Sequence, residues 1–201
     1  MDINYIYTKI KDREPYINGW EEMKRASVIV PIVNIEERLY ILFQIRSKKM
    51  RKQPGDICFP GGGIEKDETP KEAALREIKE ELGFKSIDII KELDILVRHN
   101  RLMIHPFLAE IKDIEELKIN EEEVDSVFCV PIDELLNIQP IVSEGTLIPK
   151  VPDDFPYDLV VGGKGYKFSE GVYKSIFYKY EDKAIWGITA AILENFIKII
   201  K

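Results

Sequence analysis

The alternation of apolar and polar residues along the chain predicts several short strands separated by a few helices. Strands are expected where β-branched and aromatic residues gather, at 26–33, 39–45, 57–59, 87–97, 104–111, 127–130 and 172–180. Apolar residues at helical spacing predict helices at 70–82 and 184–200, and a shorter one at 132–136. Because strands precede, separate and follow the helices, this order indicates a mixed α/β fold with a helix on each side of a sheet.

Proline and charged residues refine the first two predicted strands. Pro31 lies inside the run 26–33 and cannot donate a ladder hydrogen bond, so it favours an edge strand or a bulge. The charged stretch 36–38 separates this run from the next one and is expected to form the turn between them.

The helix predicted at 70–82 has clear signals at both ends. Thr69 and Glu72 have the spacing of a capping box, and Pro70 occupies the first helical position. Gly83 stands where the end of a helix favours a left-handed residue. On a helical wheel, the face expected to pack on the sheet carries Ala74, Leu75, Ile78 and Leu82.

The length of 201 residues fits one domain with additions better than two domains. Residues 1–24 are polar and aromatic and are expected to form a short helix or an extension packed on the domain. An irregular excursion is expected at 139–180, where 139–168 hold many prolines and glycines. The prediction is a single domain that spans 1–201.

Composition and charge narrow the kinds of function. A net charge of −7 argues against a broad nucleic-acid-binding surface, although a metal or a local basic patch can still bind a polyanionic small molecule. Cys58 and Cys129 form neither a disulfide framework nor a zinc pattern and are expected to be small core residues. No apolar run approaches the roughly 20 residues that cross a bilayer, and the N-terminus lacks signal-peptide features. We therefore expect a soluble, cytoplasmic protein without membrane contact.

Three glutamates of the predicted helix at 70–82 are neighbours in space. Glu77, Glu80 and Glu81 lie at positions i, i+3 and i+4. Like charges so close together destabilise a helix unless they are neutralised, and a hard divalent cation prefers such oxygen ligands. Arg76 lies beside this group and can orient one carboxylate. Taken alone, the group is more often a solvated acidic face that pairs with Arg76 or Lys79.

The full spacing around these glutamates changes that interpretation. Gly62, then Glu68 after five residues, then the run 76–84 after seven more match the Nudix box at every fixed position. The sequence therefore resembles the Nudix hydrolase superfamily. This resemblance implies an α/β/α sandwich with a mixed sheet, and an enzyme that hydrolyses a diphosphate bond with Mg²⁺ or Mn²⁺. It also implies a metal site formed by Glu77, Glu80 and Glu81, with Arg76 beside them.

The general base varies within the superfamily, so two possibilities stay open. The base is one of the same three glutamates, or it is a glutamate on a distant loop. For the loop we choose Glu123, in the acidic run 121–123 just before a predicted strand. The alternative for that run is a solvated surface.

A second pattern lies directly before the box. Arg46-Ser47, Arg51, Gly55 and the run 59–62 follow the spacing of a signature found in the coenzyme A diphosphatase branch of the superfamily, although residues 42–45 depart from its start. The resemblance implies a small-molecule substrate of the coenzyme A type. Arginine can hold its phosphates through a bidentate fork. The residues expected to bind it are Arg46, Lys48, Arg51, Gly61 and Gly62. The alternative is that residues 46–56, the basic loop, are simply a solvated surface segment.

These motifs leave three functions open. The first is a coenzyme A diphosphatase that yields 3′,5′-ADP and 4′-phosphopantetheine or its acyl derivative. The second is a Nudix enzyme for another nucleoside diphosphate, such as ADP-ribose, NADH or a dinucleoside polyphosphate. The third is a non-catalytic sensor, which predicts loss of the box glutamates that are present here. Trp186 is expected in the core, and the alternative is a platform on which a nucleotide base stacks. His99 and His105 are expected to be structural or surface residues, and a homodimer stays open.

Overall fold

A mixed β-sheet forms the centre of the computed structural model, which describes residues 2–201. Strand β1 (Lys24–Ile35) runs parallel to β7 (Leu102–Ile111), from Lys24 opposite Leu102 to Val33 opposite Ile111. The other pairings of this sheet are antiparallel. The prediction of a mixed sheet is therefore confirmed.

The remaining strands of this sheet have between two and nine residues. They are β2 (Arg38–Arg46), β3 (Ile57–Cys58), β4 (Gly61–Gly63), β5 (Ile87–Glu92), β6 (Leu96–Arg98) and β8 (Val124–Pro131). The order across the sheet is β3-β2-β1-β7-β5, with β4 on β1, β6 on β7 and β8 on β2. The single strand predicted at 87–97 is two strands, β5 and β6. Both pair with β7, and the chain bends between them near Leu93.

The prediction that Pro31 marks an edge strand or a bulge is wrong, because β1 lies inside the sheet. β7 flanks one side of β1, while β4 pairs with residues 26–28 and β2 with residues 32–35 on the other side. On this second side the Ile29 N–H donates to the Pro60 carbonyl at 2.9 Å. Backbone groups alternate sides along a strand, so the nitrogen of Pro31 faces the interval between β4 and β2. A missing N–H is tolerated there.

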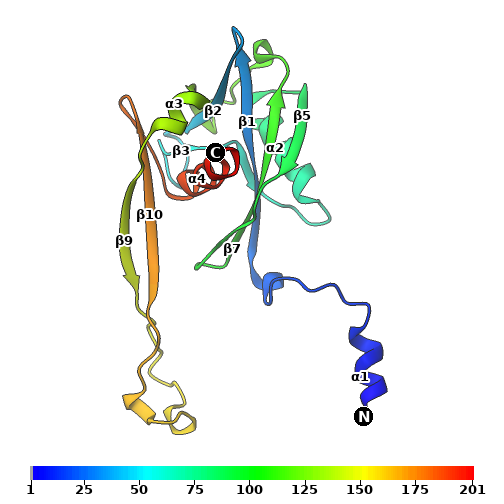
Figure 1. Ribbon diagram of the computed structural model, residues 1–201, viewed down its shortest axis with the longest axis vertical. Coiled ribbons are helices and arrows are strands. Elements are labelled where there is room, and N and C mark those ends of the chain that lie inside the picture. The colour runs from blue at the N-terminus through cyan, green and yellow to red at the C-terminus, as the bar shows by residue number, and fades with distance from the viewer. Residues whose placement is uncertain (1) are drawn as a thin grey trace.

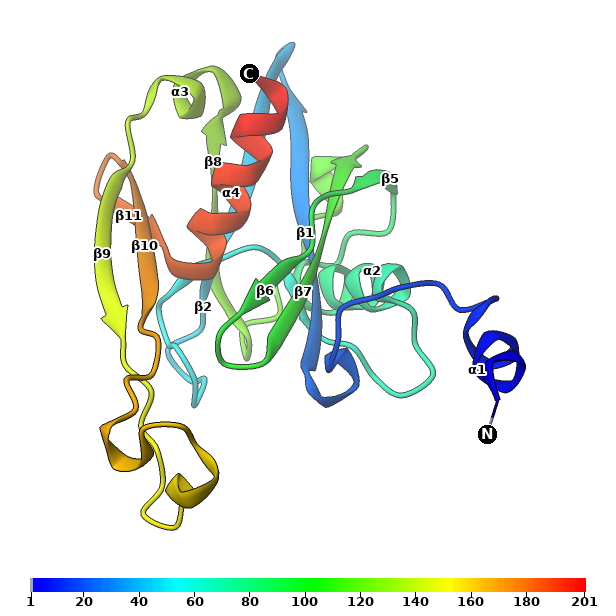
Figure 2. The ribbon, with the colours of Figure 1, turned by 60° about the horizontal axis from the view of Figure 1, so that its bottom comes forward.

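Helices cover both faces of the main sheet, as Figure 2 shows. Helix α2 (Pro70–Leu82) packs on one face and α4 (Gly187–Ile200) on the other. Successive residues of β1 point to opposite faces, so Ile29 packs with Ile78 of α2 and Val30 packs with Phe196 of α4. This arrangement confirms the predicted α/β/α sandwich.

Helix α2 has the bounds and the caps that its sequence predicts. Thr69 and Glu72 form a capping box, Pro70 starts the helix, and Gly83 ends it in the left-handed region at φ 77°. Its buried apolar residues include Ala73, Ala74, Ile78 and Leu82. Leu75, expected on this face, is only half-buried.

The excursion expected to be irregular contains a second, ordered sheet. Strands β9 (Ile141–Leu147), β10 (Gly171–Tyr180) and β11 (Lys183–Trp186) form an antiparallel sheet in the order β11-β10-β9. Figure 1 shows β9 and β10 as a long ribbon beside the main sheet, with residues 148–170 at its far tip. Only this tip is irregular, with 3-10 turns at Tyr157–Leu159 and Gly163–Gly165.

The last helix begins later than its apolar spacing predicts. Residues 184–186 belong to β11 and pair with β10, with Ala184 opposite Lys179 and Trp186 opposite Phe177. The strand partner overrides the helical pattern at these three positions. Helix α4 then starts at Gly187, whose φ of 65° turns the chain out of the strand.

The N-terminal extension is packed only through its second half. Helix α1 (Ile3–Ile10) has no buried residue and stands away from the body in Figure 1. Tyr16 instead reaches the sheet, where its hydroxyl lies 3.6 Å from the Met103 sulfur, and a 3-10 turn follows at Trp20–Glu22.

A further 3-10 turn (Ile114–Glu116) and helix α3 (Ile132–Asn137) flank β8. Within residues 2–201, none of the helices combines the length and apolarity needed to cross a bilayer.

Candidate active site

The glutamates of α2 face the loop that leads into the helix. Glu81 is only 2% exposed, and the Gly61 N–H donates to its Oε2 at 2.9 Å. Glu77 lies directly behind Gly62, close enough that a methyl group on Gly62 would overlap its carboxylate. Glu80 points outward, with 54% of its side chain exposed. The three neighbours on the helix therefore sit at three depths, from buried Glu81 to exposed Glu80.

Arg76 holds the carboxylates of Glu77 and Glu80 in place. Its Nη1 donates to Glu77 Oε1 at 2.8 Å and to Glu80 Oε2 at 3.2 Å. Its Nε and Nη2 donate to the two carboxylate oxygens of Glu68 at 2.9 and 3.1 Å, and Nη2 also reaches the Gly63 carbonyl at 3.1 Å. The predicted orienting role of Arg76 corresponds to these contacts, which join the start of the box to the middle of α2.

Burial changes the acidity of the two inner glutamates. Burial raises the pKa of Glu81 to about 7, against the opposing effect of the Gly61 N–H, and the charges of Glu77 and Glu123 add to the rise. The pKa of Glu77 is also raised, mainly by burial, while Arg76 acts in the opposite direction. Ionisation of both carboxyl groups is energetically unfavourable at this proximity unless a cation lies beside them.

Glu123 lies close to this pair although it is far away in sequence. Its charge contributes to the raised pKa of both Glu77 and Glu81. Two backbone hydrogen bonds hold its loop: the Asn120 N–H donates to the Glu81 carbonyl at 2.9 Å, and the Ser47 N–H donates to the Glu123 carbonyl at 2.8 Å. The loop that carries Glu123 is therefore fixed between the end of α2 and the basic loop that follows β2.

The donor set suits a hard divalent cation. Carboxylate oxygens are the ligands that Mg²⁺ and Mn²⁺ prefer, and a cation would remove the cost of ionising Glu77 and Glu81 together. Within residues 2–201 no three carboxylate, histidine or cysteine side chains already converge on one point, and Arg76 holds Glu77 and Glu80 instead. Arg76 binds one oxygen of each of these two carboxylates, so the second oxygen of each is left for a metal.

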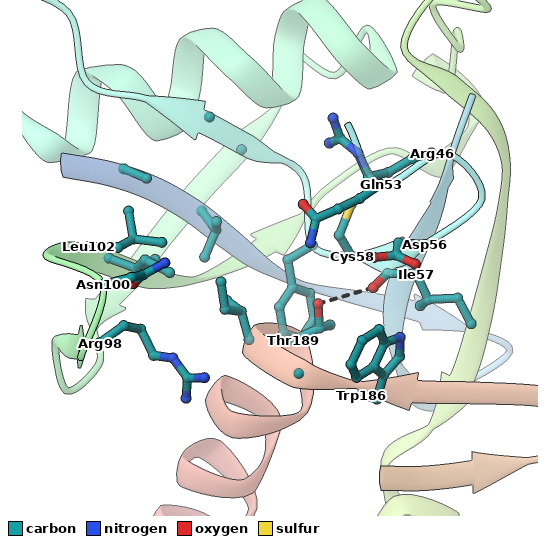
Figure 3. Close-up of a pocket in the computed structure, with 18 of the residues that line it drawn as sticks. Arg46, Gln53, Asp56, Ile57, Cys58, Arg98, Asn100, Leu102, Trp186 and Thr189 are labelled. Carbon is teal, nitrogen blue, oxygen red and sulfur yellow. Dashed lines mark hydrogen bonds between the residues drawn. The ribbon is translucent and has the colours of Figure 1, made fainter. Parts of the chain in front are cut away.

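A cavity of about 670 Å³ opens beside these carboxylates (Figure 3). Gly61 and Gly62 form part of its wall, so the backbone that contacts Glu77 and Glu81 also faces the cavity. Arg46 and residues 56–59 continue this wall, and the opposite side comes from the β6–β7 hairpin, β10 and the first turn of α4. The volume is in the range of cavities that bind nucleotide-sized molecules.

The substrate-binding residues predicted from the upstream pattern fall into two groups. Arg46, Gly61 and Gly62 line the cavity. Lys48 and Arg51 are exposed on the basic loop and lie outside the cavity wall. Lys49 of the same loop pairs with Glu122, its Nζ 2.6 Å from Oε1. The structure therefore brings only part of the basic loop to the cavity.

Three other residues of the cavity wall were missed by sequence reasoning. Trp186 was expected in the core, but it is 43% exposed, stacks on Phe177 with 5.9 Å between ring centroids, and lines the cavity. Arg98 and Tyr173 also line it. They come from segments that lie far apart in the sequence and from two different sheets, so only the packing of the β6–β7 hairpin beside β10 brings them together.

The two cysteines and the two histidines differ in burial and in their distance from the cavity. Cys58 is half-buried in the cavity wall, and burial raises the pKa of its thiol. Cys129 is half-buried against the core under α2. His99 is exposed at the cavity rim, with its ring 5.3 Å from that of Tyr173, whereas His105 is buried with Nδ1 2.8 Å from Glu92 Oε1.

Both the family match and the named relatives of this chain point to one protein family. The NUDIX domain family matches residues 23–149. "Nudix hydrolase 3" of Caenorhabditis elegans is 38% identical over 116 residues, which are 55% of this chain and 48% of that protein. "Peroxisomal coenzyme A diphosphatase NUDT7" of Mus musculus is 34% identical over 118 residues, which are 57% of this chain and 50% of that protein. The chain spans about half the length of these two curated relatives.

A bacterial relative and a solved structure extend over more of the chain. "Uncharacterized Nudix hydrolase NudL" of Yersinia enterocolitica is 30% identical over 173 residues, covering 85% of this chain and 78% of that protein. The crystal structure of a MutT/nudix family protein from Enterococcus faecalis aligns with a TM-score of 0.52 at 16% identity, covering 100% of this chain and 70% of that one. The structural likeness supports the sandwich fold.

Proposed function

This chain belongs to the Nudix family, and from that premise we propose that it is a coenzyme A diphosphatase. It would hydrolyse the diphosphate bond of coenzyme A or a coenzyme A thioester, with 3′,5′-ADP and 4′-phosphopantetheine or its acyl derivative as products. The observation that carries the proposal is the cavity lined by Arg46, Gly61 and Gly62, because the backbone of these two glycines contacts the carboxylates of Glu81 and Glu77. Relatives such as the mouse peroxisomal coenzyme A diphosphatase support this choice of substrate.

The proposed metal ligands are the glutamates of α2. Glu77, Glu80 and Glu81 would hold Mg²⁺ or Mn²⁺, which supplies a Lewis acid that neutralises the phosphate oxygens. Arg76 holds one oxygen of Glu77 and one of Glu80 in the structure, so it would keep both side chains ordered for the metal. The carboxylate of Glu68 accepts hydrogen bonds from Nε and Nη2 of Arg76 and so fixes the direction of the guanidinium.

The substrate diphosphate would lie along Gly61 and Gly62. Residues without side chains allow a phosphate to come close to the backbone and to the carboxylates behind it. Arg46 enters the same cavity at the end of β2 and would hold a phosphate oxygen through its guanidinium. The scissile bond would thereby be oriented before the chemical step.

The proton of the attacking water requires a base, and two positions are supported. Glu123 lies on a loop that Ser47 and the end of α2 hold beside the carboxylates. Glu81 has a pKa of about 7, which suits a group that takes up a proton near neutral pH. The choice between them is tested by the Glu123 variant described below.

A substrate panel tests the proposed function. Coenzyme A, acetyl-coenzyme A, dephospho-coenzyme A, ADP-ribose, NADH and a dinucleoside polyphosphate would each be incubated with Mg²⁺ or Mn²⁺, and the products separated by chromatography. We expect 3′,5′-ADP from coenzyme A and the highest kcat/KM for a coenzyme A compound. A kcat/KM at least tenfold higher for ADP-ribose, NADH or a dinucleoside polyphosphate would overturn the proposal in favour of that substrate class.

A further inference from the structure

The cavity carries two arginines on different walls. Arg46 lies at the end of β2, beside Gly61 and Gly62, whereas Arg98 ends β6 on the β6–β7 hairpin. Asp56 is the one carboxylate among the lining residues that the structure describes. Both arginines thus face a space in which positive charge exceeds negative charge, although the whole chain has a net charge of −7.

Three other arginines of the chain are paired with carboxylates. Arg38 pairs with Asp133, Arg76 with Glu68 and Arg101 with Glu22, with nitrogen–oxygen distances between 2.8 and 2.9 Å. Arg98 is held differently, because its guanidinium carbon lies 5.2 Å from the centre of the Tyr173 ring. An aromatic face orients a guanidinium without cancelling its charge or using its N–H donors. Arg98 is therefore fixed in direction and free to bind an anion.

The position of Arg98 separates it from the diphosphate site. Figure 3 shows Arg98 extending from the hairpin toward the start of α4, with Arg46 on the other side of the cavity. Residues 187–189 of α4 also line the cavity, and the positive end of the helix dipole lies there. A ligand held by Arg46 and the glycines would need a second anionic group, some distance along the molecule, to reach Arg98.

We propose that Arg98 binds the 3′-phosphate of coenzyme A and is the residue that distinguishes this substrate from dephospho-coenzyme A. The inference rests on the proposed function, in which the diphosphate occupies the Gly61–Gly62 wall. A phosphomonoester on the ribose is a second anion in the same ligand, and the planar guanidinium of Arg98 can bind two of its oxygens. Lys48 and Arg51, which the upstream pattern also predicts to bind the substrate, are exposed and lie outside the cavity wall.

Nucleotide binding tests the assignment without catalysis. Calorimetry with a chelator present would compare adenosine 3′,5′-bisphosphate with adenosine 5′-monophosphate, which lacks the second phosphate. We expect Arg98→Ala to raise the Kd for the bisphosphate by about 10- to 100-fold, as for loss of a charge-assisted contact, and to affect the monophosphate much less. Arg98→Lys should restore part of the affinity, because it keeps the charge and loses the fork.

Arg101→Ala is the matched control, because this arginine is on the same hairpin but pairs with Glu22 on the surface. It should bind both nucleotides as the wild type does. Equal weakening of both nucleotides by Arg98→Ala, or no weakening of either, would overturn the assignment. A circular dichroism melt of each variant identifies any loss that comes from unfolding.

Kinetic measurements distinguish a wrong assignment of Arg98 from a wrong proposed function. We expect the ratio of kcat/KM for coenzyme A to that for dephospho-coenzyme A to fall at least tenfold in Arg98→Ala, mainly through KM for coenzyme A. If coenzyme A is hydrolysed and the ratio does not change, only the role of Arg98 is wrong. If the wild type hydrolyses ADP-ribose and not coenzyme A, the proposed function itself is wrong.

Discussion

The Ser47 hydroxyl donates a hydrogen bond to the Glu121 carbonyl at 3.0 Å. Ser47 is 4% exposed, and its backbone N–H also donates to the Glu123 carbonyl at 2.8 Å. One serine thus binds the acidic loop through both its side chain and its backbone. Ser47 directly follows Arg46, the proposed phosphate ligand. Its two hydrogen bonds therefore connect Arg46 to the loop that carries Glu123, a proposed base.

Replacement of Ser47 by alanine tests this connection. The change leaves the Glu121 carbonyl without its side-chain donor, so we expect a loss of about 1 kcal/mol in the free energy of unfolding, measured by denaturant titration. If Glu123 acts in the reaction, kcat should fall more than KM rises. Lys49→Ala serves for comparison, since its exposed ion pair with Glu122 ties the same loop more weakly. Equal kinetic losses in the two variants would contradict a special role for Ser47.

The raised pKa of Glu81 predicts a pH-dependent stability of the metal-free protein. The folded state holds this proton up to about pH 7, whereas the unfolded chain releases it near the ordinary value of 4.5. Stability contributed by the protonated form is therefore present at low pH and falls as pH rises from about 4.5 to 7, by roughly 3 kcal/mol at most. Thermal melting in EDTA should show a higher Tm at pH 5.5 than at pH 8, after correction for the other groups.

Glu81→Gln isolates the contribution of this one carboxyl. The amide cannot ionise, so the decrease in Tm between pH 5.5 and pH 8 should be smaller in the variant than in the wild type. Mg²⁺ should raise the Tm of the wild type at pH 8 more than that of the variant, because ligand binding stabilises the folded state. Activity should be lost in the variant. A melting profile identical to that of the wild type at both pH values would show that Glu81 does not titrate as described.

Glu123→Gln tests whether the distant loop supplies the base. General-base catalysis contributes about 10²- to 10⁴-fold, so kcat should fall by an amount in that range while the fold is kept. Glu121→Gln is the matched control, because this glutamate is exposed in the same acidic run. We expect it to change kcat by less than about twofold. If Glu123→Gln also has a small effect, the base is among the glutamates of α2.

The parts of the structure that local sequence signals determine were predicted well. The capping box at Thr69 and the bounds of α2 depend on neighbouring residues, and both were found where they were expected. The turn expected at 36–38 is formed by Glu36 and Glu37, and Arg38 already belongs to β2. Residues 184–186 were assigned to the wrong element, because their helical spacing is overridden by pairing with β10, which lies elsewhere in the sequence.

The candidate site likewise contains residues that local spacing identifies and residues that it does not. Glu77, Glu80 and Glu81 were identified by spacing on one helix, and their roles stay predictions. Residues on the far wall of the cavity, such as Arg98 and Tyr173, follow from the packing of a hairpin against a distant ribbon. An arginine and a tyrosine separated by some seventy positions leave no periodic signal, so three-dimensional structure was needed to find them.

Gly62→Ala tests the contact between the glycine wall and the helix carboxylates. A methyl group at this position would overlap the Glu77 carboxylate, so Glu77 or strand β4 must move. A displacement near 1 Å in an active site can cost about 100-fold in rate, and we expect a loss of at least that size in kcat/KM. Gly63→Ala is a stringent control, because a methyl group there meets no atom within 4 Å. It should keep kcat/KM within about twofold of the wild type. Similar losses in both variants would mean that β4 tolerates no side chain at all, and that the close approach of Gly62 to Glu77 is not the cause.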